Sequence, residues 1–282
     1  MGGRETGTCH TCSVARETGL DTVTQPGENH PLATNVVARI DPFEAREEFA
    51  RLMMSYKFGL DEVMTKVNIL KEEFTYIHDY SPIEHVASRL KSAESILKKA
   101  QRKNCPPTVE HIKAQISDIA GIRITCSFVA DTYLIRDMLA GQADITVIDV
   151  KDYIANPKPN GYQSLHLIIE VPVFMSDRVE AVRVEIQIRT VAMDFWASVE
   201  HKIYYKYDGE VPDSLLAELK EAAVAVTSLD MKMERLYGEV AKLGEQSAGS
   251  AADLPSGFSR LPLPNGYLEA FLTQLPDTDA PS

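Results

Sequence analysis

Three segments in the middle of the chain alternate polar and apolar residues with a period of two. Residues 122–125 read Ile-Arg-Ile-Thr, residues 164–167 read Ser-Leu-His-Leu, and residues 185–189 read Glu-Ile-Gln-Ile-Arg. Successive side chains of a β-strand point to opposite faces, so each segment predicts a strand with one apolar and one polar face. Two interpretations stay open: a sheet whose outer face meets water, or a polar cleft assembled on that face.

The segments around these strands predict an α+β fold. Helices and strands are mixed along the chain without a regular βαβ rhythm, which argues for this class. The expected strands span 83–91, 119–128, 145–150, 164–171 and 179–189, and the expected helices span 43–73, 93–103, 191–203 and 212–243, with a further helix that Asp131 caps and that ends near Gly141.

Both ends of the chain differ in composition from its middle. Residues 1–40 and 245–282 are rich in Gly, Ser, Thr and Pro and show no apolar period, so we predict two disordered tails around a folded unit at 41–244. The first tail carries Cys9 and Cys12 in a C-x-x-C arrangement. Two ligands alone are weak evidence for zinc, so we favour free thiols on a flexible arm, with zinc or redox use as the lesser alternative.

The sequence shows neither an export signal nor a membrane segment. The first residues contain no apolar h-region, and no apolar run approaches the ~18 residues that span a bilayer. The four cysteines are therefore interpreted as reduced thiols, and we expect a cytoplasmic protein without a membrane partner.

Charge is distributed unevenly along the chain. The net charge of −12 argues against general binding of nucleic acid, so a phosphate site requires a local basic patch. Residues 83–113 supply one, with seven Lys and Arg residues against three Glu. The spacing of three or four residues places several cations and a hydroxyl on one side of a helix, namely Lys91, Ser95, Lys99 and Arg102. This side either binds an anionic phosphate chain or is simply a solvated helix face.

Two carboxylates and one loop complete the candidate site. Asp118 precedes a predicted strand and Glu185 lies within another, and a pair of carboxylates beside phosphates is a usual way to hold Mg²⁺. The alternatives are a turn cap and an exposed strand residue. The loop 156–162 could place Lys158 on a phosphate and Tyr162 on a base. Its Pro-Asn-Gly-Tyr recurs at 264–267, so only the longer string that continues to His166 is informative.

The sequence contains neither a Walker A loop nor a G-x-G-x-x-G fingerprint, so a nucleotide site requires another design. Its strings resemble the synthetase domain of the RelA/SpoT family, above all the single-domain small alarmone synthetases of the RelQ type. They occur in the family's order between about residues 60 and 240. The strings are Arg89-x-Lys91-x-x-x-Ser95, Asp118-Ile119-Ala120-Gly121-Ile122-Arg123, Lys158-Pro159-Asn160-Gly161-Tyr162-Gln163-Ser164-Leu165-His166 and Glu185-Ile186-Gln187-Ile188-Arg189-Thr190.

The resemblance implies a nucleotidyltransferase-like fold with a mixed β-sheet flanked by helices, and it implies a reaction. The β,γ-pyrophosphate of ATP would pass to the 3′-OH of GDP or GTP, giving (p)ppGpp and AMP in the stringent response, with Mg²⁺ as cofactor. Asp118 and Glu185 would be the catalytic and metal-binding residues. By the same resemblance, the ATP-binding residues would be Arg89, Lys91, Ser95, Lys99 and Arg102, and the guanine-nucleotide-binding residues Arg123, Lys158, Asn160, Tyr162, His166 and Gln187.

Partners are also expected from the resemblance. It suggests a homotetramer, with the helices from Phe43 and from Pro212 as interface candidates, and a possible weak binding of single-stranded RNA. His78-Asp79 is an isolated H-D pair, so we expect no hydrolase activity. The alternative function is a non-catalytic guanine-nucleotide or RNA-binding regulatory module that uses the same cleft.

Overall fold

The computed structural model describes residues 41–77, 80–205 and 212–247. Contacts divide the chain after Asp41, and every element below belongs to the unit that begins at Pro42. Four features that the sequence singled out lie outside the described residues: the first predicted tail, the C-x-x-C arrangement, His78-Asp79 and the second Pro-Asn-Gly-Tyr. Of the second predicted tail, residues 245–247 are described and form the end of a helix, whereas residues 248–282 lie outside.

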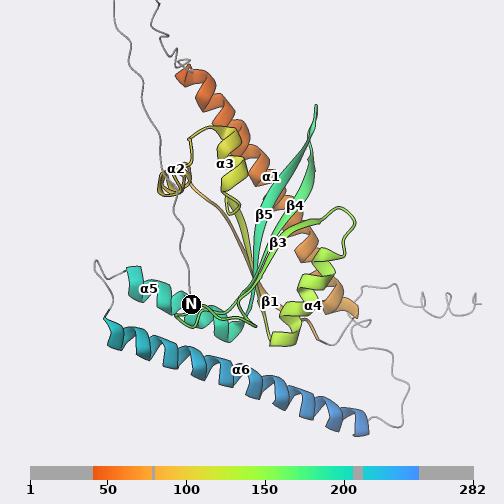
Figure 1. Ribbon diagram of the computed structural model, residues 1–282. Helices are drawn as coiled ribbons and strands as arrows, with labels where there is room; N and C mark the ends of the chain where they lie inside the picture. The colour runs from red at the N-terminus through yellow and green to blue at the C-terminus, as the bar shows by residue number, and fades with distance from the viewer. Residues whose placement is uncertain (1–40, 78–79, 206–211, 248–282) are drawn as a thin grey trace, which may run out of the picture. The chain divides into compact units, whose positions relative to one another are not determined.

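A five-stranded sheet forms the centre of the fold (Figure 1). Its spatial order is β1-β2-β5-β4-β3. Strands β2 and β5 pair in parallel, whereas the other neighbours are antiparallel, so the sheet is mixed as expected. The strands are β1 (Ile83–Leu90), β2 (Ala120–Cys126), β3 (Thr146–Asp152), β4 (Leu165–Phe174) and β5 (Val179–Thr190).

Helices α1 and α4 cover the apolar face of this sheet, while α5 and α6 lie against each other at the ends of β2 and β5 (Figure 1). Helix α1 packs against β1, β2, β5 and β4, because it crosses the sheet from the β1 edge. Helices α2 and α3 follow the edge strand β1. The helices are α1 (Pro42–Ile77), α2 (Ala93–Arg102), α3 (Val109–Gln115), α4 (Val129–Ala140), α5 (Val191–Tyr205) and α6 (Asp213–Ser247).

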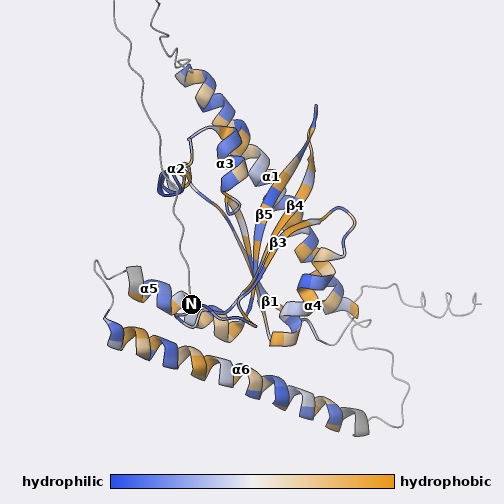
Figure 2. Cartoon of the chain, viewed as in Figure 1, coloured by the Kyte–Doolittle hydropathy of each residue, from blue (hydrophilic) through white to orange (hydrophobic). Residues whose placement is uncertain are grey.

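The alternation in the sequence decides which face becomes the core (Figure 2). Ile122 and Ile124 on β2 and Ile186 and Ile188 on β5 are buried, together with Leu165 on β4. Each such side chain contributes about 1.5–3 kcal/mol on burial, so the apolar face fixes the strand register. The polar residues between them must then share the opposite face. None of the described helices is both long and apolar enough to cross a membrane.

Two local details differ from the expectations. Helix α3 was not expected, and it begins where the hydroxyl of Thr108 accepts the backbone N–H of His111. Asp131 caps the next helix as predicted, but from a different position: α4 begins at Val129 after the N-cap Phe128, and Asp131 lies in its first turn. The Asp131 carboxylate accepts the N–H of Phe128 at 3.0 Å, so a backbone donor at the start of the helix has a partner from within the first turn.

Candidate active site

The strand register brings the polar residues of four strands into adjacent rows. Glu185 on β5 lies opposite Gly121 on β2, and Gly121 lies opposite Arg89 on β1. Two residues further along β5, Gln187 pairs with Arg123 on β2 and with His166 on β4. The sequence-predicted residues of these strands therefore share one face of the sheet.

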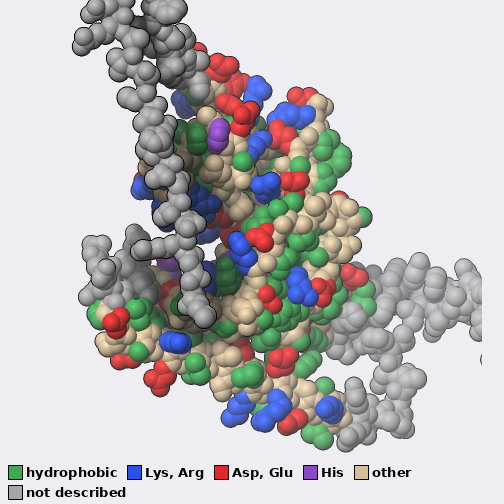
Figure 3. Space-filling view, in the orientation of Figure 1, with side chains coloured by type: hydrophobic (Ala, Val, Ile, Leu, Met, Phe, Trp, Pro, Cys, Tyr) green, Lys and Arg blue, Asp and Glu red, His purple; other side chains and the backbone are tan. Residues whose placement is uncertain are grey.

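This face carries a cavity of about 330 Å³ that Arg89, Arg123, Glu185 and Gln187 line. The side chain of Arg89 lies over Gly121, close enough that a Cβ there would sit 3.6 Å from its Cγ. Lys and Arg side chains gather beside the sheet near α2 (Figure 3). The cavity thus joins cationic walls to one carboxylate, which suits an anionic ligand.

A second group of charges lies at the end of the cleft where β2 begins. The ammonium groups of Lys91 and Lys99 each lie 2.6 Å from Oδ2 of Asp118. Burial is the largest influence on the Asp118 carboxyl and raises its pKa, but the two lysines more than offset it, so the pKa lies below its usual value. Burial likewise lowers the pKa of Lys91, against the opposing effect of Asp118. We call Lys91, Lys99 and Asp118 the lysine–aspartate cluster.

Local structure explains how this cluster assembles. Lys91 follows β1, and its backbone N–H donates to the carbonyl of Ile119 at 2.8 Å, which brings it beside the start of β2. Lys99 comes from α2, whose N-cap Ser92 accepts the backbone N–H of Ser95 at 3.3 Å. Ser95 therefore lies in the first turn of α2, and Arg102 is exposed in its last turn.

The two carboxylates have properties that fit a magnesium ion. Oδ1 of Asp118 is buried without a hydrogen-bond partner, although Oδ2 contacts two lysines. Glu185 lies in the polar face on β5, opposite Gly121 on β2, the strand that Asp118 precedes. Mg²⁺ keeps several waters and needs only one or two protein carboxylates. No group of three or more His, Cys, Asp and Glu side chains within the described segments has a metal-binding arrangement.

The loop between β3 and β4 forms the opposite end of the cleft. Gly161 has a φ of +88°, the left-handed region that the turn requires. The ammonium group of Lys158 lies 4.5 Å from the ring centre of Tyr153 and 4.6 Å from that of Tyr162. Asn160 stabilises the turn, because its Oδ1 accepts the N–H of Tyr162 and its Nδ2 donates to Glu200 at 3.0 Å. We call residues 158–166 the tyrosine loop.

Hydrogen bonds connect the tyrosine loop to Glu185. The hydroxyl of Tyr162 lies 2.8 Å from Nε2 of His166, and Nδ1 of His166 lies 3.5 Å from Oε1 of Glu185. Gln187 donates to the other oxygen of Glu185 at 3.1 Å. Burial is the largest influence on the Glu185 carboxyl and raises its pKa, but His166 and Gln187 together bring the pKa below its usual value. Glu185 is therefore ionised at neutral pH.

Helix α6 supports the tyrosine loop from behind. Thr227 donates to the side-chain oxygen of Gln163 at 2.7 Å, and Trp196 on α5 donates to the carbonyl of Leu219 at 3.1 Å. The backbone of Gly161 approaches Ala223 so closely that a Cβ on Gly161 would lie 2.4 Å from the Ala223 side chain. The position of α6 thus fixes the position of the loop.

Sequence reasoning assigned no role to three residues that contact this site: Tyr153, Arg189 and Asp194. Arg189 is the third polar position of the 185–189 alternation, and that pattern was the available signal. Asp194 lies 3.3 Å from both Arg123 and Arg189, but it comes from α5, so no strand pattern could indicate it. Tyr153 contributes a ring to the tyrosine loop from the end of β3.

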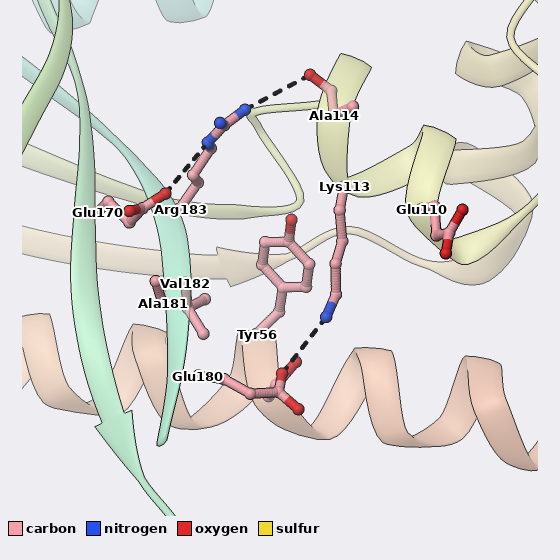
Figure 4. Close-up of a pocket in the computed structure, with 10 residues that line it drawn as sticks. Tyr56, Glu110, Lys113, Ala114, Glu170, Glu180, Ala181, Val182 and Arg183 are labelled. Atoms are coloured by element: carbon pink, nitrogen blue, oxygen red, sulfur yellow. Dashed lines mark hydrogen bonds and ion pairs between the residues drawn. The ribbon is translucent and has the colours of Figure 1, made fainter. Parts of the chain in front are cut away.

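Another cavity, of about 290 Å³, lies between α1, α3 and the far end of β5 (Figure 4). Its two cations each face a carboxylate: Lys113 lies 3.4 Å from Glu180, and Arg183 lies 3.5 Å from Glu170. The hydroxyl of Tyr56 points between them. Because the carboxylates balance the cations, this cavity suits a phosphate chain less well than the polar cleft.

The polar cleft combines two carboxylates, several cations and aromatic rings, which is typical of proteins that carry out chemistry on nucleotide phosphates. The particular family follows from comparison with known proteins. The chain belongs to the RelA/SpoT family, whose model, described as a region found in RelA / SpoT proteins, matches residues 88–210.

Relatives match a longer share of the chain than the family model does. GTP pyrophosphokinase YwaC of Bacillus subtilis is 53% identical over 194 residues, which cover 69% of this chain and 92% of the relative. The crystal structure of small alarmone synthetase 1 from Bacillus subtilis bound to its product pppGpp has a TM-score of 0.64 at 40% identity and covers 69% of this chain and 98% of its own. The same enzyme bound to AMPCPP has a TM-score of 0.60 at 37% identity, with 70% and 99% covered.

Proposed function

We propose that this chain is a (p)ppGpp synthetase, which transfers the β,γ-pyrophosphate of ATP to the 3′-OH of GDP or GTP and releases AMP. The observation that carries the proposal is the position of Glu185. It lies in the polar face between the lysine–aspartate cluster at one end and the tyrosine loop at the other. A reaction between two nucleotides needs two binding regions that meet at one reactive group, and this cleft provides them. The similarity to pyrophosphokinases supports the same activity.

ATP is assigned to the lysine end of the cleft. Arg89 would stack on adenine and the remaining cations and hydroxyl would bind the phosphates. The cavity wall at Arg89 and the convergence of two lysines on Asp118 support this assignment. The complete ATP set is Arg89, Lys91, Ser95, Lys99 and Arg102.

The guanine nucleotide is assigned to the tyrosine end. The ring of Tyr162 would stack on the base. The ammonium group of Lys158 lies beside this ring and would neutralise charge on the phosphates of the same nucleotide. Asn160 acts through the turn that it stabilises. The complete guanine set is Arg123, Lys158, Asn160, Tyr162, His166 and Gln187.

Asp118 and Glu185 are the residues that would hold Mg²⁺, and the metal would neutralise charge on the migrating pyrophosphate. The ionised Glu185 accepts the proton of the 3′-OH as general base, which prepares that oxygen for attack on the β-phosphorus of ATP. Lys91 and Lys99 hold Oδ2 of Asp118, which leaves its unpartnered Oδ1 for the metal.

The proposal also includes the setting in which the enzyme works. We assign it to the cytoplasm, as a homotetramer with no membrane partner and with weak affinity for single-stranded RNA at most. Exposed apolar residues on α1 and α6 support an assembly through these helices: Phe43, Met54 and Phe58 on α1, and Val240 and Leu243 on α6.

The direct test incubates the protein with ATP, Mg²⁺ and either GDP or GTP, and separates the nucleotides by ion-exchange chromatography. We expect a guanosine 3′-diphosphate product together with an equal amount of AMP, and no product when EDTA removes the metal. Equilibrium binding of both nucleotides without any product would favour the non-catalytic regulatory module instead.

A further inference from the structure

We propose that Arg189 is a positioning residue that sets the direction of the hydrogen bonds reaching Glu185. Arg189 does not itself contact Glu185. It acts along two branches, one through Gln187 and one through Tyr162 and His166. The structural part of the inference stands on the hydrogen bonds alone, whereas its catalytic consequence rests on the proposed function.

Arg189 is buried at the tyrosine end of the cleft, and its side chain is 6% exposed. One terminal nitrogen faces Asp194 at 3.3 Å, and the other donates both to Gln187 and to the hydroxyl of Tyr162. Its Nε is buried without a partner. A guanidinium group has five donor hydrogens and no acceptor, and it stays charged at all ordinary pH values. Arg189 is therefore the donor in each of these hydrogen bonds.

The first branch runs along β5. Because Arg189 can only donate, Gln187 must turn its amide oxygen toward it. The amide nitrogen of Gln187 then points the other way and donates to Oε2 of Glu185 at 3.1 Å. Without Arg189, either end of this amide could face Glu185, and the oxygen would repel the carboxylate.

The second branch crosses to β4. The hydroxyl of Tyr162 accepts from Arg189 at 3.2 Å, so its own hydrogen points to Nε2 of His166 at 2.8 Å. Burial raises the pKa of Tyr162, which keeps that hydrogen in place. A neutral imidazole that accepts at Nε2 carries its hydrogen at Nδ1, and Nδ1 faces Oε1 of Glu185 at 3.5 Å.

Both branches consequently reach Glu185 as donors, one to each carboxylate oxygen. This arrangement holds the side chain of Glu185 in one orientation and favours its ionised form. Asp194 balances the buried charge, because it also faces Arg123 at 3.3 Å. One cation at the guanine end thereby prepares the general base in the middle of the cleft.

The decisive measurement needs no substitution. Long-range ¹H–¹⁵N NMR correlation of the full chain reports which ring nitrogen of His166 carries hydrogen. We expect hydrogen at Nδ1 only. Hydrogen at Nε2, or at both nitrogens, would overturn the proposal. This result does not depend on catalysis, so it remains valid even if no alarmone is produced.

Two variants test the catalytic consequence. Arg189→Gln can present an acceptor to Tyr162, so we expect kcat to fall about 100-fold, within the range for a disturbed general base, with the KM for GDP changed less than about threefold. Arg189→Lys keeps a donor-only cation and should recover at least about a tenth of the wild-type kcat. A loss that falls mainly on the KM for GDP would show that Arg189 merely holds the Tyr162 ring, and would contradict the proposal.

A matched control and an alternative variant keep the test valid if the Arg189 variants do not fold. Arg183→Gln changes the same residue type on the same strand and face, away from the cleft, and should leave kcat within about twofold. If the Arg189 variants do not fold, Tyr162→Phe interrupts the second branch and keeps the ring. We then expect a mixture of His166 tautomers and a lower kcat, whereas an unchanged tautomer would refute the relay.

Discussion

The ammonium group of Lys91 lies 2.6 Å from Oδ2 of Asp118, and this contact joins the end of β1 to the start of β2. Lys99 reaches the same oxygen from α2. The other oxygen, Oδ1, is buried and has no partner. Asp118 thus divides its two oxygens, one for the cations of the protein and one that is left for a ligand. This division is the structural basis for assigning a metal to this end of the cleft.

We expect Asp118→Asn and Glu185→Gln each to reduce synthesis at least about 100-fold, because each removes a metal ligand at nearly constant volume. Initial rates at saturating nucleotide check this. The two variants should differ in stability. Asn at 118 leaves two partly buried lysines facing each other, which costs about 1–3 kcal/mol in urea unfolding. Activity above a tenth of wild type in either variant would contradict the assignment.

Substitution of two neighbouring lysines on α2 distinguishes a specific phosphate contact from the effect of general surface charge. Lys99→Met should raise the KM for ATP about tenfold or more, because it removes a charge-assisted contact at the cleft. Lys98→Met is the matched control, since Lys98 is exposed and pairs only with Glu94 on the same helix face among the contacts described. It should leave that KM within about twofold. Equal effects of both substitutions would show general electrostatic attraction rather than a specific contact.

The repeated tetrapeptide provides a second pair. Tyr162→Ala should raise the KM for the guanine nucleotide by roughly five- to 150-fold and leave that for ATP nearly unchanged, because a base–aromatic stack contributes about 1–3 kcal/mol. Tyr267→Ala, in the second Pro-Asn-Gly-Tyr, should have no measurable effect on either constant. Steady-state kinetics with each substrate varied in turn make the comparison. A larger effect at Tyr267 would refute the assignment of guanine to the tyrosine loop.

Two glycines provide a third matched pair, because one is tightly packed and the other has open space around it. Gly161→Ala places a Cβ 2.4 Å from Ala223 at a φ of +88°, so it should destabilise the protein by about 1–3 kcal/mol and raise the KM for the guanine nucleotide. Gly238→Ala, on α6 with no neighbour within 4 Å, should instead stabilise it by about 0.5–1 kcal/mol. Thermal unfolding of both variants decides this. A stable, fully active Gly161→Ala would disprove the tight support of the loop by α6.

The strands of the sheet could be predicted from the sequence alone, because period-two alternation identifies both faces of a strand, whereas their spatial order could not. Glu185, Gln187 and Arg123 were predicted to share a polar face, and the register confirms it. The residues at which helices begin were harder to predict from the sequence. In α4 the carboxylate of Asp131 accepts the N–H of Phe128, and the sequence does not show whether such a capping residue stands before the helix or within its first turn.

Contacts between elements distant in the chain could not be read from local patterns. The pairing of Asp194 with Arg123 and Arg189 joins α5 to two strands, and the support of Gly161 by Ala223 joins α6 to a loop. Each depends on how a helix packs, which is decided by the whole core. The hydrogen bond from the Asn160 amide to Glu200 on α5 could not be predicted from the sequence either, because the two residues are distant in the chain.

The central claim, pyrophosphate transfer, is tested most directly by following the β-phosphorus of ATP. With ATP labelled at that position, Mg²⁺ and GDP, the account predicts that all transferred label appears in a guanosine 3′-diphosphate product, with unlabelled AMP formed in equal amount. Glu185→Gln in the same assay should give neither. Label that is retained in ADP would show transfer of a single phosphoryl group, and that result would contradict the account.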